Sequence, residues 1–230
     1  IWRPFSLPAT LLSLPCFISL NVNEGKMQEQ TVKTPILIYT EETPNPDSLK
    51  FVVNIILYPG GTGDFRDVES AQKWSPLAAA LFEFPYVKGV YISNNFVSVT
   101  KEATYSWVEI QQSIKDFIKH YVIDDKPVIN EGYGEELKRL EAERIAKAYS
   151  GDTAAIVQKI KDLIETVVKP AVANDGGNIE FKSYDKGVVT VIMQGSCSGC
   201  PSSTLTLKAG IEGMLKRMVP EVLEVVSEMG

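Results

Sequence analysis

The sequence has few residues suited to metal binding or acid–base chemistry. Its 230 residues include three cysteines, Cys16, Cys197 and Cys200, and one histidine, His120. Three cysteines are too few for the disulfide framework of a small secreted protein, so a reducing compartment fits better. A lone histidine is more often a solvated or half-buried residue than a ligand, and we assign His120 no role.

Excess basic charge and long apolar runs are also missing. The chain has 23 basic and 29 acidic residues, which gives a net charge of -6. This balance excludes the broad positive field that binds a phosphate backbone, so we expect no nucleic acid partner. A membrane-spanning helix needs about 20 consecutive apolar residues. The sequence has no such run, and we expect no membrane partner.

Residues 1–34 are interpreted as a leader or upstream extension, without order. Pro8 and Pro15 interrupt a mostly apolar stretch from Leu7 to Leu20, and the segment matches neither a signal peptide nor a transit peptide well. The chain opens with Ile1, so a start at Met27 is the interpretation we favour. Cys16 then lies in this extension and is incidental.

The pattern from residue 35 to residue 122 predicts a first α+β domain. Ser75 is expected to cap a helix that has Pro76 at its first position. The Gly60-Gly61-Thr62-Gly63 run is interpreted as a loop and not a phosphate cradle, because no Lys-Ser/Thr pair follows it. Alternating and helical periodicity predict strands over 36–39, 49–53, 87–92 and 96–100, and helices over 75–82 and 107–121.

Residues 123–151 are polar and are interpreted as a partly helical linker whose charged run is a solvated face. A second α+β domain is predicted over residues 152–230. Its expected elements are a helix with the apolar stripe Ile156, Ile160, Leu163, Ile164 and Val167, strands over 178–183 and 188–193, a helix over 207–218 and a last strand over 221–227. The fold class is therefore α+β, with two small α+β domains joined by the linker. We expect the fragment 151–230 to fold alone.

The Cys197-Ser198-Gly199-Cys200 loop carries the candidate chemistry. It lies between a predicted strand and a predicted helix that begins at Pro201. Free amides and the positive end of a helix dipole favour thiolate over thiol, which makes both sulfurs better ligands and nucleophiles. Since both cysteines lie in a polar turn, we expect them to add little core packing.

Counting ligands narrows the use of this loop. Zinc sites and the common iron-sulfur clusters take four ligands, and only two cysteines lie outside the extension. A metal centre would therefore be shared by two chains about a two-fold axis. Two alternatives remain, a dithiol-disulfide oxidoreductase and a structural zinc dimer. A thioredoxin-like fold is disfavoured, because only one helix and one strand follow Cys200.

Two stretches then resemble the Nfu-type iron-sulfur carrier proteins, which include a domain like the C-terminal domain of NifU. The first runs from Thr43-Pro44-Asn45-Pro46-Asp47 to Phe51, with Ser75-Pro76-Leu77-Ala78 and Val87-Lys88-Gly89-Val90 behind it. The second is Asn174-Asp175-Gly176-Gly177 followed by Gly195-Ser196-Cys197-Ser198-Gly199-Cys200-Pro201-Ser202-Ser203. Asn174 and Asn178 stand where the family often has acidic residues, and we interpret the Asp175-Gly176-Gly177 turn as structural.

The resemblance implies a [4Fe-4S] cluster shared between two subunits, with Cys197 and Cys200 as its ligands. It also implies a carrier that is not an enzyme, that receives clusters from upstream assembly proteins and that yields them to apo iron-sulfur proteins. The loaded form would be a homodimer. The expected compartment is the bacterial cytoplasm, with a mitochondrial or plastid matrix as the alternative.

Overall fold

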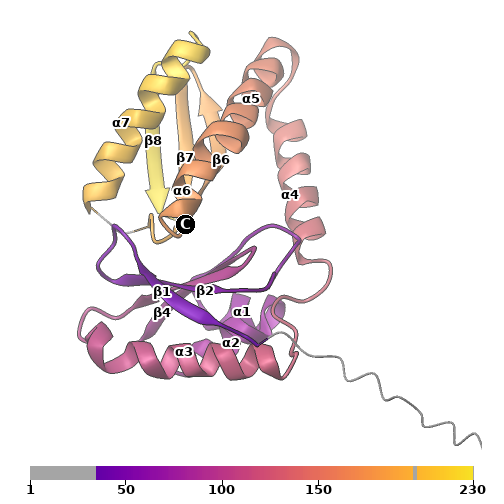
Figure 1. Ribbon diagram of the computed structural model, residues 1–230. Helices are drawn as coiled ribbons and strands as arrows, with labels where there is room; N and C mark the ends of the chain where they lie inside the picture. The colour runs from indigo at the N-terminus through magenta and orange to yellow at the C-terminus, as the bar shows by residue number, and fades with distance from the viewer. Residues whose placement is uncertain (1–34, 199–200, 230) are drawn as a thin grey trace, which may run out of the picture. The chain divides into compact units, whose positions relative to one another are not determined.

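The computed structural model describes residues 35–198 and 201–229, with backbone alone for 201–207 and for 229. Residues 35–230 form one compact unit with two sheets and helices (Figure 1). The α+β class predicted from the sequence is confirmed. Within the described ranges, no helix combines the length and apolarity needed to cross a membrane.

The first sheet has five antiparallel strands in the order β1-β2-β5-β4-β3. Ser93 pairs with Phe96, so Asn94 and Asn95 form a two-residue hairpin turn between the strands that the sequence predicts over 87–92 and 96–100. The strands are β1 (Ile38–Glu42), β2 (Ser48–Val53), β3 (Gly63–Phe65), β4 (Val87–Ser93) and β5 (Phe96–Lys101).

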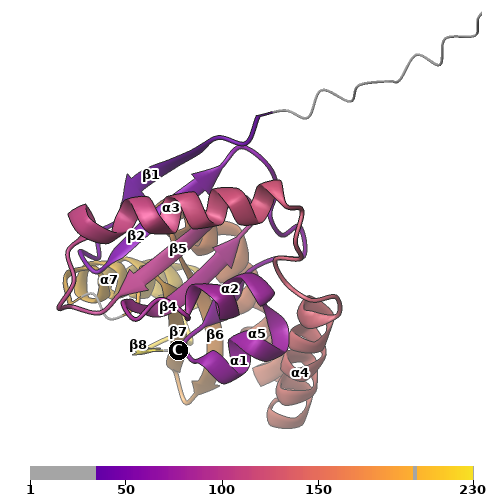
Figure 2. The same ribbon diagram turned by 90° about the horizontal axis from the view of Figure 1, so that it is seen from below.

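Three helices accompany this sheet, and two of them supply most of the helical part of its core. They are α1 (Val68–Trp74), α2 (Pro76–Leu81) and α3 (Trp107–Ile123), and Figure 2 shows α2 and α3 over the strands. Ser75 Oγ accepts a 3.0 Å hydrogen bond from Ala78 N, which confirms the predicted cap of α2. Apolar residues at helical spacing in α3 meet alternate residues of the strands, and the core includes Phe51, Leu77, Leu81, Val97, Val99, Ile110, Ile114 and Ile118.

In the first domain, β3 and α1 are the elements that the sequence patterns do not predict. β3 has only three residues, too few to show an alternating pattern. The Gly60-Gly61-Thr62 part of the glycine run is outside regular structure as expected, but Gly63 begins β3.

The linker contains a helix, α4 (Tyr133–Ala148), that packs against both cores. Tyr133 at its beginning is buried with the first core. Ile145 and Tyr149 at its other end pack against the second core. Arg144 donates hydrogen bonds to the carbonyl oxygens of Lys182 and Phe181. The charged side of α4 is exposed, while its ends tie it to both sheets.

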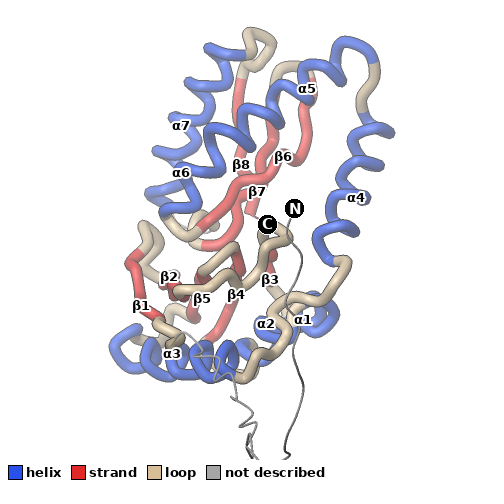
Figure 3. Tube along the Cα trace, turned by 45° about the vertical axis from the view of Figure 1, so that its right-hand side comes forward, coloured by secondary structure: helices blue, strands red, loops and turns tan. Residues whose placement is uncertain are grey.

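The second sheet has three strands in the order β6-β7-β8, and the helices cover one face of it (Figure 3). β6 and β7 are antiparallel, whereas β8 returns through α7 to lie parallel to β7. Alternate residues of β7 are buried, as expected for a sheet packed on one side. The elements are α5 (Gly151–Leu163), η1 (Ile164–Val168), α6 (Lys169–Asn174), β6 (Gly177–Asp185), β7 (Val188–Gly195), α7 (Pro201–Met218) and β8 (Glu224–Met229).

A π-helical turn, η1, lies just before Pro170, and one predicted core position there is wrong. The expected apolar stripe included Val167, but Val167 is 52% exposed. Val168 and Val172 are buried instead, continuing from Ile160 and Ile164 at intervals of four. A π turn adds a residue to the helical repeat, so the buried face shifts by about one position.

Candidate functional site

Cys197 lies in the segment that leaves β7 at Gly195 and leads toward α7 at Pro201. Cys197 is only 4% exposed and belongs to the second core. The expectation that Cys197 adds little packing is therefore wrong. The predicted partner ligand Cys200 lies outside the described residues, together with Gly199. Within residues 35–198 and 201–229, no group of three or more His, Cys, Asp or Glu residues could hold a metal ion.

Gly177 explains how the thiol comes to be buried. A Cβ atom on Gly177 would lie 2.4 Å from Cys197 Sγ, 2.8 Å from the carbonyl oxygen of Gln194 and 3.0 Å from Cys197 N. The sulfur therefore packs where any larger residue would place its side chain. The second glycine of the Asp175-Gly176-Gly177 turn is thus part of the cysteine site.

The turn also holds the residue before the cysteine. Ser196 N donates to the carbonyl oxygen of Gly176 at 3.3 Å, and Ser196 Oγ donates to the carbonyl oxygen of Asp175. Gly176 has φ +77°, a conformation that glycine adopts readily. These contacts of the turn fix the beginning of the cysteine loop.

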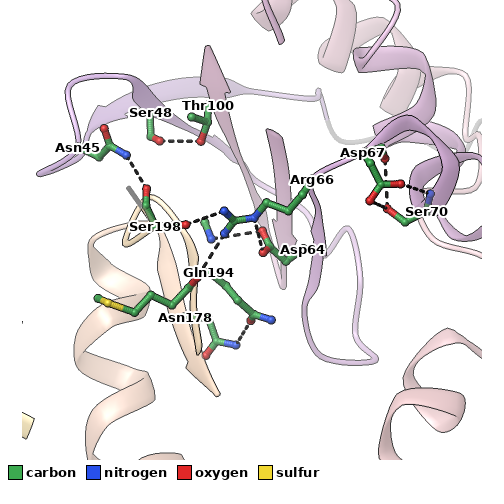
Figure 4. A network of polar contacts seen from close by, with 12 residues as sticks. Asn45, Ser48, Asp64, Arg66, Asp67, Ser70, Thr100, Asn178, Gln194 and Ser198 are labelled. Atoms are coloured by element: carbon green, nitrogen blue, oxygen red, sulfur yellow. Dashed lines mark hydrogen bonds and ion pairs between the residues drawn. The ribbon is translucent and has the colours of Figure 1, made fainter. Parts of the chain in front are cut away.

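Two side chains of the first domain reach the residue after the cysteine (Figure 4). Asn45 Nδ2 donates to the carbonyl oxygen of Ser198 at 3.1 Å. Arg66 Nη1 donates to Ser198 Oγ at 2.6 Å, and its Nη2 donates to the carbonyl oxygen of Met193 at 3.3 Å. Ser198 is 7% exposed. The hydroxyl and the carbonyl oxygen of this loop residue are therefore held from the other domain.

Asp64 orients the arginine that makes these contacts. Its carboxylate accepts from Arg66 Nε at 2.8 Å and from Gly195 N at 3.3 Å. Burial raises the pKa of Asp64 above its ordinary value, although Arg66 and the Gly195 amide oppose the rise. The pair places a buried carboxyl group and a partly exposed guanidinium beside the loop, with side-chain exposures of 8% and 31%.

Asn178 joins the two long strands of the second sheet. Its side-chain amide donates to Gln194 Oε1 and to Glu180 Oε1, each at 2.8 Å. Lys169 forms an ion pair with Glu180 at 3.0 Å. An amide donor suits this position, because two oxygen acceptors face it.

Comparison with known proteins connects both domains to one family. The family model "Scaffold protein Nfu/NifU N terminal" matches residues 38–125, and the model "NifU-like domain" matches residues 160–226. The iron-sulfur cluster scaffold homolog NFU1, mitochondrial, of Drosophila virilis is 36% identical over 220 residues, which is 95% of this chain and 70% of that protein. The chain belongs to the Nfu/NifU scaffold family.

One further relative and one solved structure show how much of each protein the similarity covers. The Drosophila willistoni protein of the same name is 38% identical over 192 residues, which is 83% of this chain and 63% of that relative. A NifU-like protein from Saccharomyces cerevisiae, solved in solution by NMR, has a TM-score of 0.38 and 24% identity over 42% of this chain and 86% of that one. This chain thus spans less than two thirds of the Drosophila willistoni relative.

For this Nfu-family chain, sequence reasoning singled out the cysteine loop and the glycine turn but missed the contacts of Asn45, Asp64 and Arg66 with this region. Asn45 appeared within a family motif, yet its amide bonds a residue 153 positions away. Arg66 follows a three-residue strand that has no clear sequence signal. A pattern of local periodicity carries no information about such distant pairs.

Proposed function

We propose that this chain is an iron-sulfur cluster carrier that holds a [4Fe-4S] cluster between the cysteine loops of two subunits and passes it to apo-proteins. Cys197 and Cys200 are the proposed ligands in each subunit. The observation that carries the proposal is the position of Cys197 directly between the end of β7 and the beginning of α7, within a chain of the Nfu/NifU scaffold family. The cluster is cargo, and no chemical step of substrate turnover is required.

The ligand count supports a shared cluster. A [4Fe-4S] cluster takes four thiolates, and each chain offers two in this loop. Two copies related by a two-fold axis supply four ligands at one centre. Release to a recipient then needs only an exchange of thiolates, in which recipient cysteines replace those of the carrier one at a time and the cluster keeps its charge.

Partners and compartment follow from the same assignment. The proposed recipients are apo iron-sulfur proteins, and the proposed donors are upstream cluster-assembly proteins. The relatives are named as mitochondrial proteins, which favours the mitochondrial matrix. The first expectation from the sequence, a bacterial cytoplasm, has no support from these relatives.

The test uses the full chain purified without oxygen and reconstituted with iron and sulfide. We expect broad visible absorption, four iron and four sulfide per two chains, and a dimer by sedimentation. Cys197→Ala and Cys200→Ser should each abolish the absorption and the dimer. A cluster on a stable monomer would contradict the shared-ligand arrangement. The dithiol alternative predicts a colourless protein whose cysteine pair cycles with a disulfide, and the zinc alternative predicts a colourless dimer.

A further inference from the structure

The face of the first sheet that its helices leave uncovered is nevertheless buried along β2, β4 and β5, although Tyr39 of β1 is 52% exposed. All six residues of β2 are buried, although only every second one can point toward α2 and α3. On the opposite face, Val52, Tyr91 and Phe96 form a small apolar cluster of their own. Lys50 and Ser98 are also buried, at 9% and 1% exposure. This face therefore has a cover.

The cover is the end of the second sheet that carries the cysteine loop. Ser98 Oγ donates to the carbonyl oxygen of Gly176 at 2.7 Å, and Lys50 Nζ donates to the carbonyl oxygen of Asn174 at 3.3 Å. A Cβ on Gly176 would lie 2.8 Å from Ser98 Oγ, and a Cβ on Gly195 would lie 2.9 Å from the Tyr91 ring. The two surfaces meet at backbone distance, which only these glycines allow.

Arg66 and Asn45 extend this contact onto the loop itself. Together they hold the hydroxyl and the carbonyl oxygen of Ser198, the residue that follows Cys197 (Figure 4). Ser198 and Cys197 are 7% and 4% exposed. A cluster shared between two chains requires each loop to meet the loop of a second copy. The same loop cannot meet another chain while the first domain covers Ser198.

We propose that the first domain closes over the cysteine loop of its own chain, with Arg66 and Asn45 as a clasp on Ser198, and that this closed arrangement must open before a second chain can share a cluster. The inference rests on the proposed function for what opening permits. The closure itself concerns the protein without a cluster. Closed chains are monomers whose cysteine loop is covered at Ser198, and open chains are competent to pair.

The direct test is the rate at which Cys197 of the full-length, cluster-free chain reacts with iodoacetamide, followed for its own peptide by mass spectrometry. Arg66→Ala removes the two hydrogen bonds of the arginine to the second domain, at Ser198 and Met193, together with its ion pair to Asp64. Asn45→Asp keeps the acceptor for Asp47 N at 3.0 Å but removes the donor to Ser198. We expect each variant to react about tenfold faster than wild type, because weakening the clasp increases the open population, in which the released Ser198 no longer holds the segment that carries Cys197. Arg139→Ala, on the exposed side of α4, is the matched control and should react like wild type.

The charge changes in these variants oppose the expected increase in alkylation rate. Loss of a positive group near a thiol, or gain of a negative one, by itself makes the thiol less reactive. Faster alkylation in Arg66→Ala and Asn45→Asp therefore reports exposure. Unchanged or slower alkylation in both variants would overturn the closure.

A second measurement separates local opening from loss of the fold. Alkylation through opening of the domain contact should change little in low urea, whereas alkylation through global unfolding should rise steeply with urea. A steep urea dependence in both variants would overturn the closure as the source of the increase. If alkylation behaves as expected but no cluster binds, the closure stands and the carrier function fails. If one cluster binds per two chains but alkylation does not change, the carrier function stands and the closure fails.

Discussion

Arg66 donates a 2.6 Å hydrogen bond to the hydroxyl of Ser198, a residue 132 positions further along the chain. Arg66 follows a strand of the first sheet, and Ser198 follows the buried Cys197. Since Asp64 holds the guanidinium at 2.8 Å, the arginine is oriented before it meets the serine. The first domain therefore contacts the cysteine loop itself. The contact is a hydrogen bond from a charged guanidinium, and such bonds are stronger than those between neutral groups.

Replacing Cys197 should affect stability as well as cluster binding. The side chain is buried in the second core, so a polar hydroxyl in its place loses packing and solvation. We expect Cys197→Ser to lower the free energy of unfolding by about 1–3 kcal/mol and Cys197→Ala to lower it by less. Urea denaturation of the apo-proteins measures both changes. If Cys197→Ser matched wild type, the burial of Cys197 in solution would be contradicted.

Gly177→Ala tests the close approach of the sulfur. The new methyl group would overlap Cys197 Sγ and the backbone at residue 194, so the loop must move. We expect a loss of about 1–3 kcal/mol in the free energy of unfolding, as for other overpacked sites, and a lower cluster content after reconstitution. Gly210→Ala, in helix α7 with nothing within 4 Å of its Cβ, is the control. That control should be neutral or stabilising by about 0.5–1 kcal/mol. Equal effects of the two substitutions would show that the contact is not tight.

Burial of Asp64 makes the free energy of unfolding depend on pH. Burial raises its pKa in the folded protein above the ordinary 3.8. The neutral carboxyl is therefore favoured by folding, and its contribution is complete below the ordinary pKa and is lost as the pH rises through the raised value. We expect the stability of wild type relative to Asp64→Asn to fall as the pH increases above about 4. Chemical denaturation of both proteins between acidic and neutral pH measures this difference. A relative stability that rises over the same range would reverse the assigned direction.

Helix α4 should act as part of the second domain when that domain is isolated. Arg144 bonds two carbonyl oxygens of β6, and Tyr149 Oη accepts from Tyr184 N at 2.7 Å. The fragment 133–230 retains these contacts, whereas the fragment 151–230 lacks them. We expect the longer fragment to be more stable by about 2 kcal/mol or more, from the burial of Ile145 and Tyr149 and the added hydrogen bonds. Thermal and urea unfolding of both fragments provides the measurement. Identical midpoints would mean that α4 contributes no packing to this domain.

Sequence reasoning succeeded where the signal was local. The N-cap Ser75, the Asn94-Asn95 hairpin and the helix beginning at Pro201 each depend on residues within a few positions of one another. Alternation and helical spacing also placed the long strands and helices within a few residues. Elements too short to repeat a pattern, such as β3, gave no signal.

The sequence by itself determined the α+β class, the two-domain order and the place of Cys197 between a strand and a helix, because capping, turn chemistry and hydrophobic period are properties of neighbouring residues. Only the tertiary structure decided that Cys197 is buried and that Ser198 is held by Asn45 and Arg66. Those contacts join segments more than a hundred residues apart. They depend on the fit between the open face of one sheet and the glycines at the end of another, and no local pattern encodes that fit.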